Sequence, residues 1–395
     1  MPSQKENTGC GCGSIPFSVI LLFLGVGYWG FKNLDSFNLK SRLPDAIVQY
    51  LPGEQPPATA SEQPKLNQPV SVVSPPSQTV ATQTPAAPAP PATQPQPSTN
   101  WQQKQIRGIY FSRYQVTNNA DEKTIRERVR YLRSQGINTI IHGVWGNGCT
   151  MYRSEVMQQT LGLQSCPNQF QEPWLDWLID EAHKQGMQVH AYFEKGIKLD
   201  ENSPIFETAI AKRWIVPGVD KTYPEVDHYL LDVEVPAVAN LFKQILVEFV
   251  QKYPDIDAVQ WDDYLGYHAD LPGKIDRTAQ LTQFVQQMKA EMKAANPNVS
   301  FDICHHNPYW GKQYFAADWQ NWNVDRAFIQ IYNDDNFAAE MQYAEKYAGV
   351  AITEKQLHRL AALVNNPKIE SILIFPSTGK PKEAAALVSN AASQL

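Results

Sequence analysis

Two adjacent carboxylates end a stretch that reads as a buried strand. Residues 257–264 read Asp-Ala-Val-Gln-Trp-Asp-Asp-Tyr, a pattern that predicts a buried strand followed by Asp262 and Asp263. Side chains alternate along a strand, so Trp261 and Asp262 point to opposite faces. In a barrel of parallel strands, catalytic groups are usually built at the carboxyl ends of the strands. Asp262 is therefore the first candidate for a catalytic carboxylate, and a helix cap or a loop support is the structural alternative.

A second carboxylate is expected on the same rim. Between residues 187 and 194 polar and apolar residues alternate, so the polar set should point into the barrel with Glu194 at the carboxyl end of its strand. The same alternation, applied to a strand expected at 327–332, predicts that Gln330 and Tyr332 point into the barrel. Aromatic and amide groups of this kind suit a sugar, which offers ring faces and hydroxyls. The expected binding residues of the rim are Trp145, His190, Tyr192, His306, Asn307, Gln330 and Tyr332.

Two carboxyl groups are what glycoside hydrolysis needs. One group protonates the leaving oxygen, and the other acts as a nucleophile or as a base towards water. We expect Asp262 to be the nucleophile or base and Glu194 the proton donor, with Asp263 and Asp334 as alternative acids. A separation of about 5 to 5.5 Å would indicate retention, and about 6.5 to 9.5 Å inversion. A buried hydrogen-bonded layer without catalytic function is the structural alternative for Glu194.

Four histidines raise the alternative of a metal-dependent deacetylase or amidohydrolase. His142, His190, His305 and His306 fall near the expected strand ends, but an early strand carries no His-x-His pair of the kind that such enzymes usually show. We therefore predict no metal and no cofactor.

Strand-like and helix-like segments alternate from Ile106 to the end of the chain. This makes eight βα units in about 275 residues, close to the usual size of a (β/α)₈ TIM barrel, about 250 residues; a doubly wound sheet is the rival fold. Strands are expected at 106–116, 138–145, 187–194, 257–262, 299–306, 327–332, 349–353 and 369–375. Helices are expected at 121–135, 174–186, 238–249, 277–295, 355–364 and 381–392.

The region before the barrel divides by composition. After a tail at 1–14, residues 15–31 carry no charge and end in aromatic residues, which predicts a transmembrane anchor; a cleaved signal peptide is the rival. A juxtamembrane segment follows at 32–50. Residues 51–104 are rich in Pro, Gln, Ala and Thr and hold nearly half of the prolines of the chain, so we expect a disordered linker there. The folded domain is expected at 105–395.

The net charge and the charges next to the apolar segment indicate which partners and which side of the membrane to expect. A net charge of -6 without a basic run argues against nucleic-acid binding. The lysines and arginine at 32–42 would favour a cytoplasmic side for the domain, yet a Pro-rich stalk is typical of an extracytoplasmic one. We expect a single-pass plasma-membrane protein with a periplasmic domain, a polysaccharide substrate, and a disulfide between Cys149 and Cys166 if that compartment is oxidising. Cys304 should be a core residue.

Several motifs, in order, carry a family resemblance. They are Ile106 to Ile109, Asn138-Thr139, Val144 to Ser154, Tyr192 to Gly196, Val259 to Gly266, Asn307 to Tyr309, Asp318-Trp319, and Val324-Asp325 through Gln330 to Tyr332. Over roughly residues 106–378 the chain resembles the bacterial glycosyl-hydrolase-like family ten, which has close counterparts in cyanobacteria and is often membrane-anchored.

The resemblance implies a (β/α)₈ glycosidase that acts on glycan strands, including peptidoglycan stripped of its peptides, at the barrel mouth around Asp262. It adds the motif residues Arg107 and Asn147 to the substrate-binding set. The chain departs from the family pattern at His142, at Lys195, at Tyr264-Leu265 and in a seventh unit, 337–355, that looks shortened. These departures leave a non-catalytic glycan-binding protein as the alternative function.

Overall fold

A computed structural model describes residues 99–112, 119–167, 170–223, 226–271, 273 and 275–395. The expected tail, anchor and juxtamembrane segment, and the linker up to residue 98, lie outside this part of the chain. Among the described residues, no helix has both the length and the apolar character that crossing a membrane requires.

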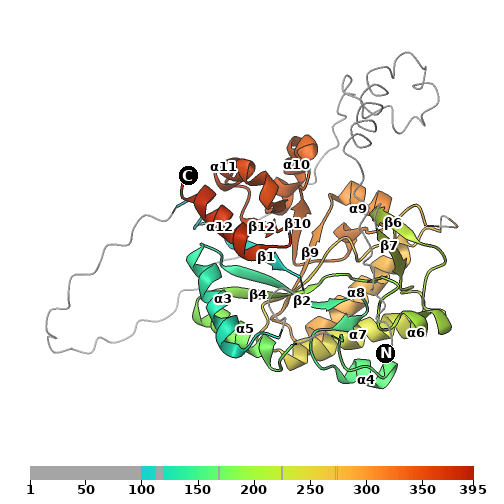
Figure 1. The fold of residues 1–395 in the computed structure, drawn as a ribbon. Coiled ribbons are helices and arrows are strands. Elements are labelled where there is room, and N and C mark those ends of the chain that lie inside the picture. The colour runs from blue at the N-terminus through green and yellow to red at the C-terminus, as the bar shows by residue number, and fades with distance from the viewer. Residues whose placement is uncertain (1–98, 113–118, 168–169, 224–225, 272, 274) are drawn as a thin grey trace, which may run out of the picture. The chain divides into compact units, whose positions relative to one another are not determined.

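Eight parallel strands form a closed barrel (Figure 1). Each strand pairs with the next one along the chain, and β1 pairs with both β2 and β12, which closes the ring. A doubly wound sheet has two open edges, so this closure confirms the predicted TIM barrel. The strands are β1 (Ile106–Phe111), β2 (Thr139–Gly146), β4 (Gln188–Phe193), β8 (Ala258–Trp261), β9 (Ser300–His305), β10 (Arg326–Gln330), β11 (Gly349–Thr353) and β12 (Ser371–Phe375).

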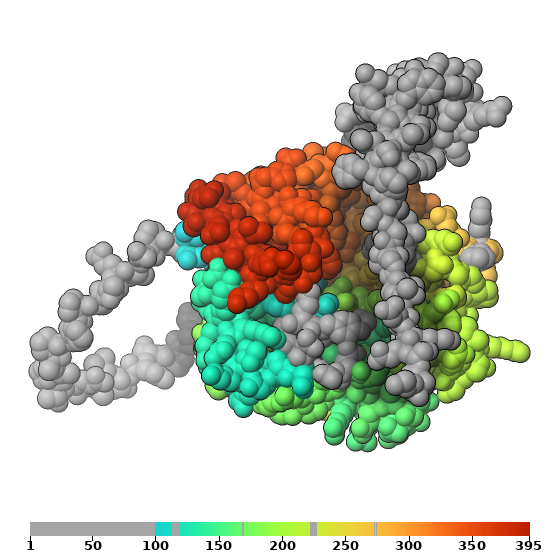
Figure 2. All heavy atoms as spheres, viewed as in Figure 1, coloured from blue at the N-terminus to red at the C-terminus, as the bar shows by residue number. Residues whose placement is uncertain are grey.

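Helices surround the barrel (Figure 1). The last helix lies beside the first: the Tyr131 hydroxyl donates a hydrogen bond to the Lys382 carbonyl at 3.3 Å, and Figure 2 shows the red C-terminal residues against cyan residues from the start of the domain. The helices are α3 (Glu122–Ser134), α4 (Glu155–Leu161), α5 (Trp174–Lys184), α6 (Phe206–Ala211), α7 (Pro236–Lys252), α8 (Thr278–Ala295), α9 (Pro308–Phe315), α10 (Phe337–Tyr347), α11 (Leu360–Val364) and α12 (Pro381–Ala392), with short 3₁₀ turns η3 (Trp319–Asn321), η4 (Asp334–Asn336) and η5 (Glu354–Arg359).

Most element boundaries follow from caps and apolar stripes. Helix α3 begins after Asp121, whose side chain accepts a hydrogen bond from the Thr124 N–H, and it buries Ile125 and Val129 against the barrel. The helix expected at 355–364 differs, because non-helical backbone angles at Gln356 leave a 3₁₀ segment before α11. The seventh unit, which looked shortened, contains the full helix α10.

Two insertions extend the barrel on the side where the strands end. The short strand β3 (Cys149–Thr150) pairs back onto the end of β2, and Cys149 forms the predicted disulfide with Cys166. After β4, a small antiparallel sheet consists of β5 (Lys198–Leu199), β6 (Asp220–Tyr223) and β7 (Val226–Leu230). Both insertions enlarge the end at which the catalytic residues are expected.

The opposite end, where the strands begin, is the floor of the barrel. Lys104 Nζ donates to the Ile369 carbonyl at 2.5 Å, just before β12. Arg107 donates to the carbonyls of Gly136 at 2.9 Å and Lys104 at 2.7 Å. Arg107, which the motifs placed among the substrate-binding residues, therefore contacts the chain at the floor, because it is the second residue of its strand and the mouth lies beyond the last.

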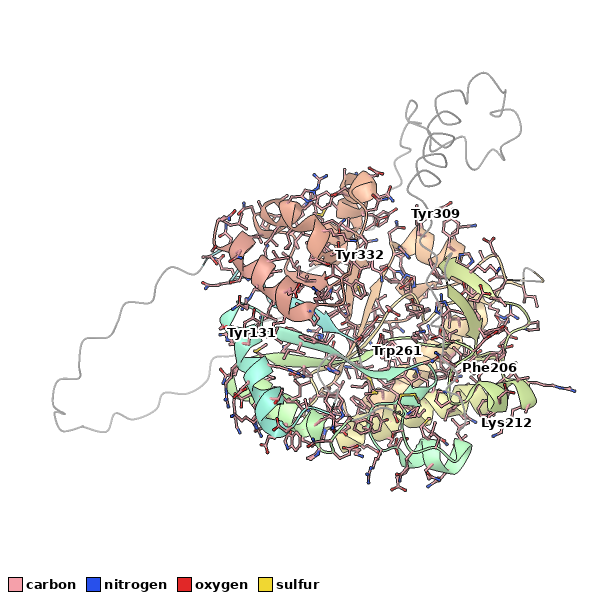
Figure 3. All side chains as sticks on the ribbon, in the orientation of Figure 1. Tyr131, Phe206, Lys212, Trp261, Tyr309 and Tyr332 are labelled. Atoms are coloured by element: carbon pink, nitrogen blue, oxygen red, sulfur yellow. A yellow bond between two sulfur atoms is a disulfide. The ribbon has the colours of Figure 1, made fainter. Side chains whose placement is uncertain are left out.

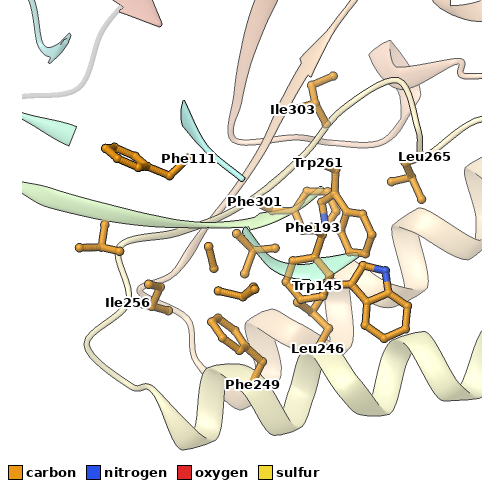
Figure 4. Packing of buried hydrophobic residues seen from close by; sticks show 14 of the residues in the cluster. Phe111, Trp145, Phe193, Leu246, Phe249, Ile256, Trp261, Leu265, Phe301 and Ile303 are labelled. Carbon is orange, nitrogen blue, oxygen red and sulfur yellow. The ribbon is translucent and has the colours of Figure 1, made fainter. Parts of the chain in front are cut away.

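The core has an inner and an outer layer. Inside the barrel, a cluster of eight buried residues includes Tyr110, Tyr192, Cys304 and Phe328, so the alternation test put the inward faces of β4 and β10 on the correct side. Cys304 is a buried free thiol, as predicted. The outer layer, between strands and helices, is rich in aromatic rings (Figure 4).

Trp145 belongs to this outer layer and is completely buried. Its ring packs against Phe193 and against Phe242 of α7, and its indole N–H donates to the Gly196 carbonyl at 2.9 Å. The pairing of β2 with β4 shifts register between Gly143 and Trp145, and this irregularity turns Trp145 outward, although strict alternation from the inward-facing Ile141 would turn it inward. Trp145 therefore supports the wall of the barrel.

Candidate active site

Asp262 and Asp263 directly follow β8 at the mouth of the barrel, and both are nearly buried, with 6% and 4% of their surface exposed. The Tyr192 hydroxyl, reaching across from β4, donates a hydrogen bond to Asp262 Oδ2. The backbone N–H of Tyr264 donates to Asp262 Oδ1 at 3.0 Å. Strand β4 and the turn after β8 thus fix the orientation of this carboxyl group.

Asp263 turns towards the strands on the other side of β8. Gln330 Nε2 donates to Asp263 Oδ1 at 3.3 Å and to the Cys304 carbonyl at 3.0 Å. His306 Nε2 lies 3.8 Å from Asp263 Oδ2. The two neighbouring acids therefore have separate sets of partners, one from β4 and one from β9 and β10.

Lys198 acts electrostatically on both carboxyl groups. It is fully buried on β5, its Nζ lies 3.1 Å from Asp220 Oδ2, and the same Nζ sits 4.7 Å from the centre of the Tyr264 ring. A Cβ on Gly196 would lie 2.5 Å from the Tyr264 carbonyl oxygen, and Gly196 has φ +47°, so a glycine lets the chain approach this closely. The sequence prediction missed Lys198, although a lysine between two apolar residues, Ile197 and Leu199, was a signal for a buried charge.

The two carboxyl groups have pKa values that move in opposite directions. Burial and the neighbouring charge of Asp263 raise the pKa of Asp262 well above its ordinary value. Burial opposes the charge of Asp263 as well, but His306, His305, Lys198 and the hydrogen bond from Gln330 together lower its pKa. The Asp262 carboxyl group therefore keeps its proton to a higher pH than the Asp263 carboxyl group, and two carboxyl groups of unequal acidity are the arrangement that acid–base catalysis requires.

Glu194 follows β4 on the same rim. Its backbone N–H donates to the Trp145 carbonyl at 3.0 Å. Burial, the charge of Asp262 and the charge of Glu194, in that order, raise the pKa of the Tyr192 phenol. Glu194 thus acts electrostatically on the same tyrosine that bonds to Asp262, and it stays a candidate for the second carboxyl group.

Tyr332 follows β10 and Phe375 ends β12, so both lie where the strands end. Their rings are 5.8 Å apart and each is 37% exposed, and Tyr332 Oη lies 3.9 Å from Cys304 Sγ inside the barrel (Figure 3). Tyr332 therefore joins the interior to the solvent-facing rim.

Four other predicted site residues lie away from this cluster. His190 points inward but near the floor, 3.8 Å from Asp302. Asn147 ties the β2 loop to the insertion by accepting from the Asp200 N–H at 2.8 Å. Asn307 caps α9 and donates to Glu340 at 2.6 Å. Asp334 is on the surface, paired with Arg359 at 2.9 Å.

The described residues contain no group of three or more His, Cys, Asp or Glu side chains arranged to hold a metal ion. Two of the four candidate histidines are remote from the carboxylates: His142 packs 4.8 Å from the Trp174 ring, and His190 belongs to the floor. Burial lowers the pKa of His142 to about 4 and that of His305 to about 3, so both are neutral at physiological pH.

A closed parallel barrel with a carboxyl pair at the carboxyl ends of its strands defines the class: a (β/α)₈ protein of the kind that performs acid–base chemistry at its mouth. The chain belongs to the glycosyl hydrolase-like 10 family, whose model matches residues 105–276 and 270–373. The resemblance carried by the motifs is thereby confirmed.

Curated relatives match part of the chain. Glycosyl hydrolase DigH of Escherichia coli (strain K12) and the protein of that name in Shigella flexneri are each 28% identical to this chain in an alignment of 212 residues, and the match covers 47% of this chain and 47% of theirs. The chain spans about half the length of the curated relatives it matches.

Solved structures that are similar in fold are more distant in sequence. A family 20 β-N-acetylglucosaminidase has a TM-score of 0.46 and 9% identity over 74% of this chain and 70% of that one. An α-amylase from Lactobacillus plantarum has a TM-score of 0.45 and 11% identity, and the match covers 71% of this chain and 72% of the amylase. The α-galactosidase AgaB from Geobacillus stearothermophilus has a TM-score of 0.43 and 14% identity, and the match covers 74% of this chain and 41% of the galactosidase.

Proposed function

We propose that this chain hydrolyses O-glycosidic bonds in a polysaccharide, the glycan strands of peptidoglycan. The observation that carries the proposal is the carboxyl pair with divergent pKa values at the barrel mouth. Family membership supports a glycan as substrate, and the name of the curated relatives supports hydrolysis.

The pKa directions favour a division of roles that differs from the sequence prediction. The raised pKa of Asp262 suits the acid that protonates the leaving oxygen, whereas the lowered pKa of Asp263 suits the base or nucleophile. Gln330 and His306 hold the Asp263 carboxylate, and Tyr192 holds Asp262. The sequence analysis expected Glu194 to be the proton donor, and the variant Glu194→Gln tests whether catalysis needs it.

We further propose that residues 15–31 anchor the chain in the plasma membrane and that the Pro-rich linker, cut back to residues 51–98 because Lys104 is bonded to the barrel floor, tethers a periplasmic barrel. The uncharged apolar run supports the anchor, and a disulfide in the domain supports an oxidising compartment over the count of flanking positive charges. Protease added to intact spheroplasts should degrade the barrel if it faces outward. Complete protection, with degradation only after lysis, would reverse the topology.

The hydrolysis proposal is tested by mass spectrometry of the products from peptidoglycan glycans, intact and peptide-stripped. Wild-type protein should shorten the strands, while Asp262→Asn and Asp263→Asn should not, and Glu194→Gln reports whether that acid is needed. Binding measured on the same samples separates the alternatives. Retained binding by all variants with no cleavage by wild type would identify a non-catalytic glycan-binding protein.

A further inference from the structure

Helix α9 presents exposed aromatic rings beside the carboxyl pair. It begins two residues after His306, which lies 3.8 Å from Asp263. Trp310 and Tyr314 are 39% and 42% exposed, although large aromatic side chains are usually buried. Tyr309, labelled in Figure 3, marks the first turn of this helix.

The rings form a continuous row that starts at the site. The His306 ring lies 6.2 Å from the Trp310 ring, and Trp310 lies 5.6 Å from Tyr314, one helical turn further on. We call His306, Trp310 and Tyr314 the aromatic row. It leads from Asp263 outward over the rim, so a ligand held at the carboxyl pair can extend along it.

The row rests on a fixed support. The His306 ring stacks on buried Phe315 at 5.1 Å, and the Asn307 side chain accepts from the Trp310 N–H at 3.0 Å. The far end of α9 is bonded to the loop after β8, where the Tyr267 N–H donates to the Phe315 carbonyl at 2.8 Å and the Ala269 N–H to the Tyr314 carbonyl at 2.9 Å. Helix α9 therefore spans the rim between β8 and β9, and a ligand would not have to order it.

The chemistry of the row identifies its occupant. Trp, Tyr and His combine a flat apolar face with a polar edge, and the row begins at His306, 3.8 Å from Asp263, so its occupant is a molecule that also reaches the carboxyl pair. A sugar ring offers the matching pair, a C–H face and peripheral hydroxyls. We propose that the aromatic row is a glycan-binding subsite that holds the sugars of a polysaccharide beyond the bond being cleaved, an inference that rests on the proposed function and specifies how a polymer is preferred over a short fragment.

The test uses the full chain with Trp310→Ala/Tyr314→Ala, and Leu387→Ala, which removes an exposed apolar side chain from helix α12, as the surface control. Affinity for peptide-stripped glycan fragments of two and of eight sugars is measured in an Asp263→Asn background, which removes turnover. The double variant should lose about tenfold or more in affinity for the long fragment. Its affinity for the short fragment, and the affinity of Leu387→Ala for both fragments, should be unchanged.

Steady-state kinetics separate this proposal from the hydrolase proposal. In the catalytically intact background, the double variant should raise KM for the polymer and leave kcat on the shortest substrate unchanged, and Trp310→Phe/Tyr314→Phe should restore most of the loss. Equal affinity of wild type and double variant for long fragments would overturn the subsite. If wild type cleaves nothing but the length-dependent binding still disappears in the double variant, the subsite stands and the hydrolase proposal fails.

Discussion

The floor and the mouth of the barrel both bury acids, yet the acids are held differently. At the floor, Arg326 donates to the Asp302 carboxylate from Nε at 2.9 Å and from Nη2 at 2.7 Å, and the Ser300 hydroxyl donates to it at 2.5 Å. At the mouth, each of two carboxyl groups that are adjacent in sequence accepts from its own neutral donor, Tyr192 for Asp262 and Gln330 for Asp263, and one buried lysine acts on both. An acid with a paired counter-charge is held as part of the fold, whereas two neighbouring acids with opposite pKa shifts are prepared for proton transfer.

The largest expected effect is on turnover at the mouth. Asp263→Asn removes the ionised partner while keeping the size of the side chain, so kcat should fall by about 10³-fold. The thermal midpoint should not fall with it, because the variant also removes a buried charge. A variant that keeps more than a tenth of wild-type kcat would exclude Asp263 from the chemistry.

The matched change at the floor should have the opposite consequence. Asp302→Asn takes the counter-charge from Arg326 and should lower the free energy of unfolding by about 2 kcal/mol. This loss of unfolding free energy should be smaller than for a fully buried ion pair, because 32% of the Arg326 side chain is exposed to solvent. Urea unfolding with an unchanged m-value measures it, and kcat per folded molecule should equal that of wild type; a loss of kcat would make the floor part of the site.

The pH profile should show two limbs that belong to the mouth. Activity needs Asp262 protonated and Asp263 ionised, so it should decline as pH rises through the raised pKa of Asp262 and as pH falls through the lowered pKa of Asp263. Lys198 lowers the pKa of both groups. Lys198→Met combined with Asp220→Asn, which leaves no unpaired charge, should therefore move both limbs to higher pH, and limbs that stay in place would remove Lys198 from the mechanism.

Stability should also depend on pH through Asp262. Its pKa is raised on folding, so its contribution to stability is complete below the unfolded value of about 4 and is lost as pH rises through the folded pKa. Asp262→Asn cannot ionise and escapes that loss. Thermal melts should show little difference from wild type at pH 4 and a more stable variant at pH 8, and a difference that does not grow with pH would contradict the raised pKa.

The smallest effect is expected where a predicted acid lies outside both regions. Asp334 pairs with Arg359 and His358 on the surface. Exposed pairs contribute little, so Asp334→Asn should match wild type in kcat, KM and thermal midpoint. A reduced kcat would bring this acid back into the site.

The fold was predictable because its signals are local and repeated. Alternation in β4, β8 and β10 correctly put Tyr192, Asp262 and Gln330 inside the mouth. Alternation gives the face of a strand and not the depth along it, which is why His190 points inward and yet lies at the floor.

Other features depend on contacts that no periodic pattern encodes. The register shift in β2 turned Trp145 into the outer layer. Lys198 reaches the carboxyl pair only because an inserted sheet after β4 folds back against the turn after β8, where the Ile197 N–H bonds to the Tyr264 carbonyl at 3.1 Å. The opposite pKa directions of Asp262 and Asp263 depend on residues from four strands, so they become visible only in three dimensions.

The way the chain enters the barrel has a practical consequence for handling the protein. Lys104 and Arg107 fasten the entering segment to the floor, at the end away from Asp262. A fusion partner, an affinity tag or a solid support joined just before Thr99 would thus meet the barrel at its base. Immobilisation through that point should leave the opening accessible to an insoluble polymer, whereas coupling through α9 or the β5–β7–β6 sheet should obstruct it.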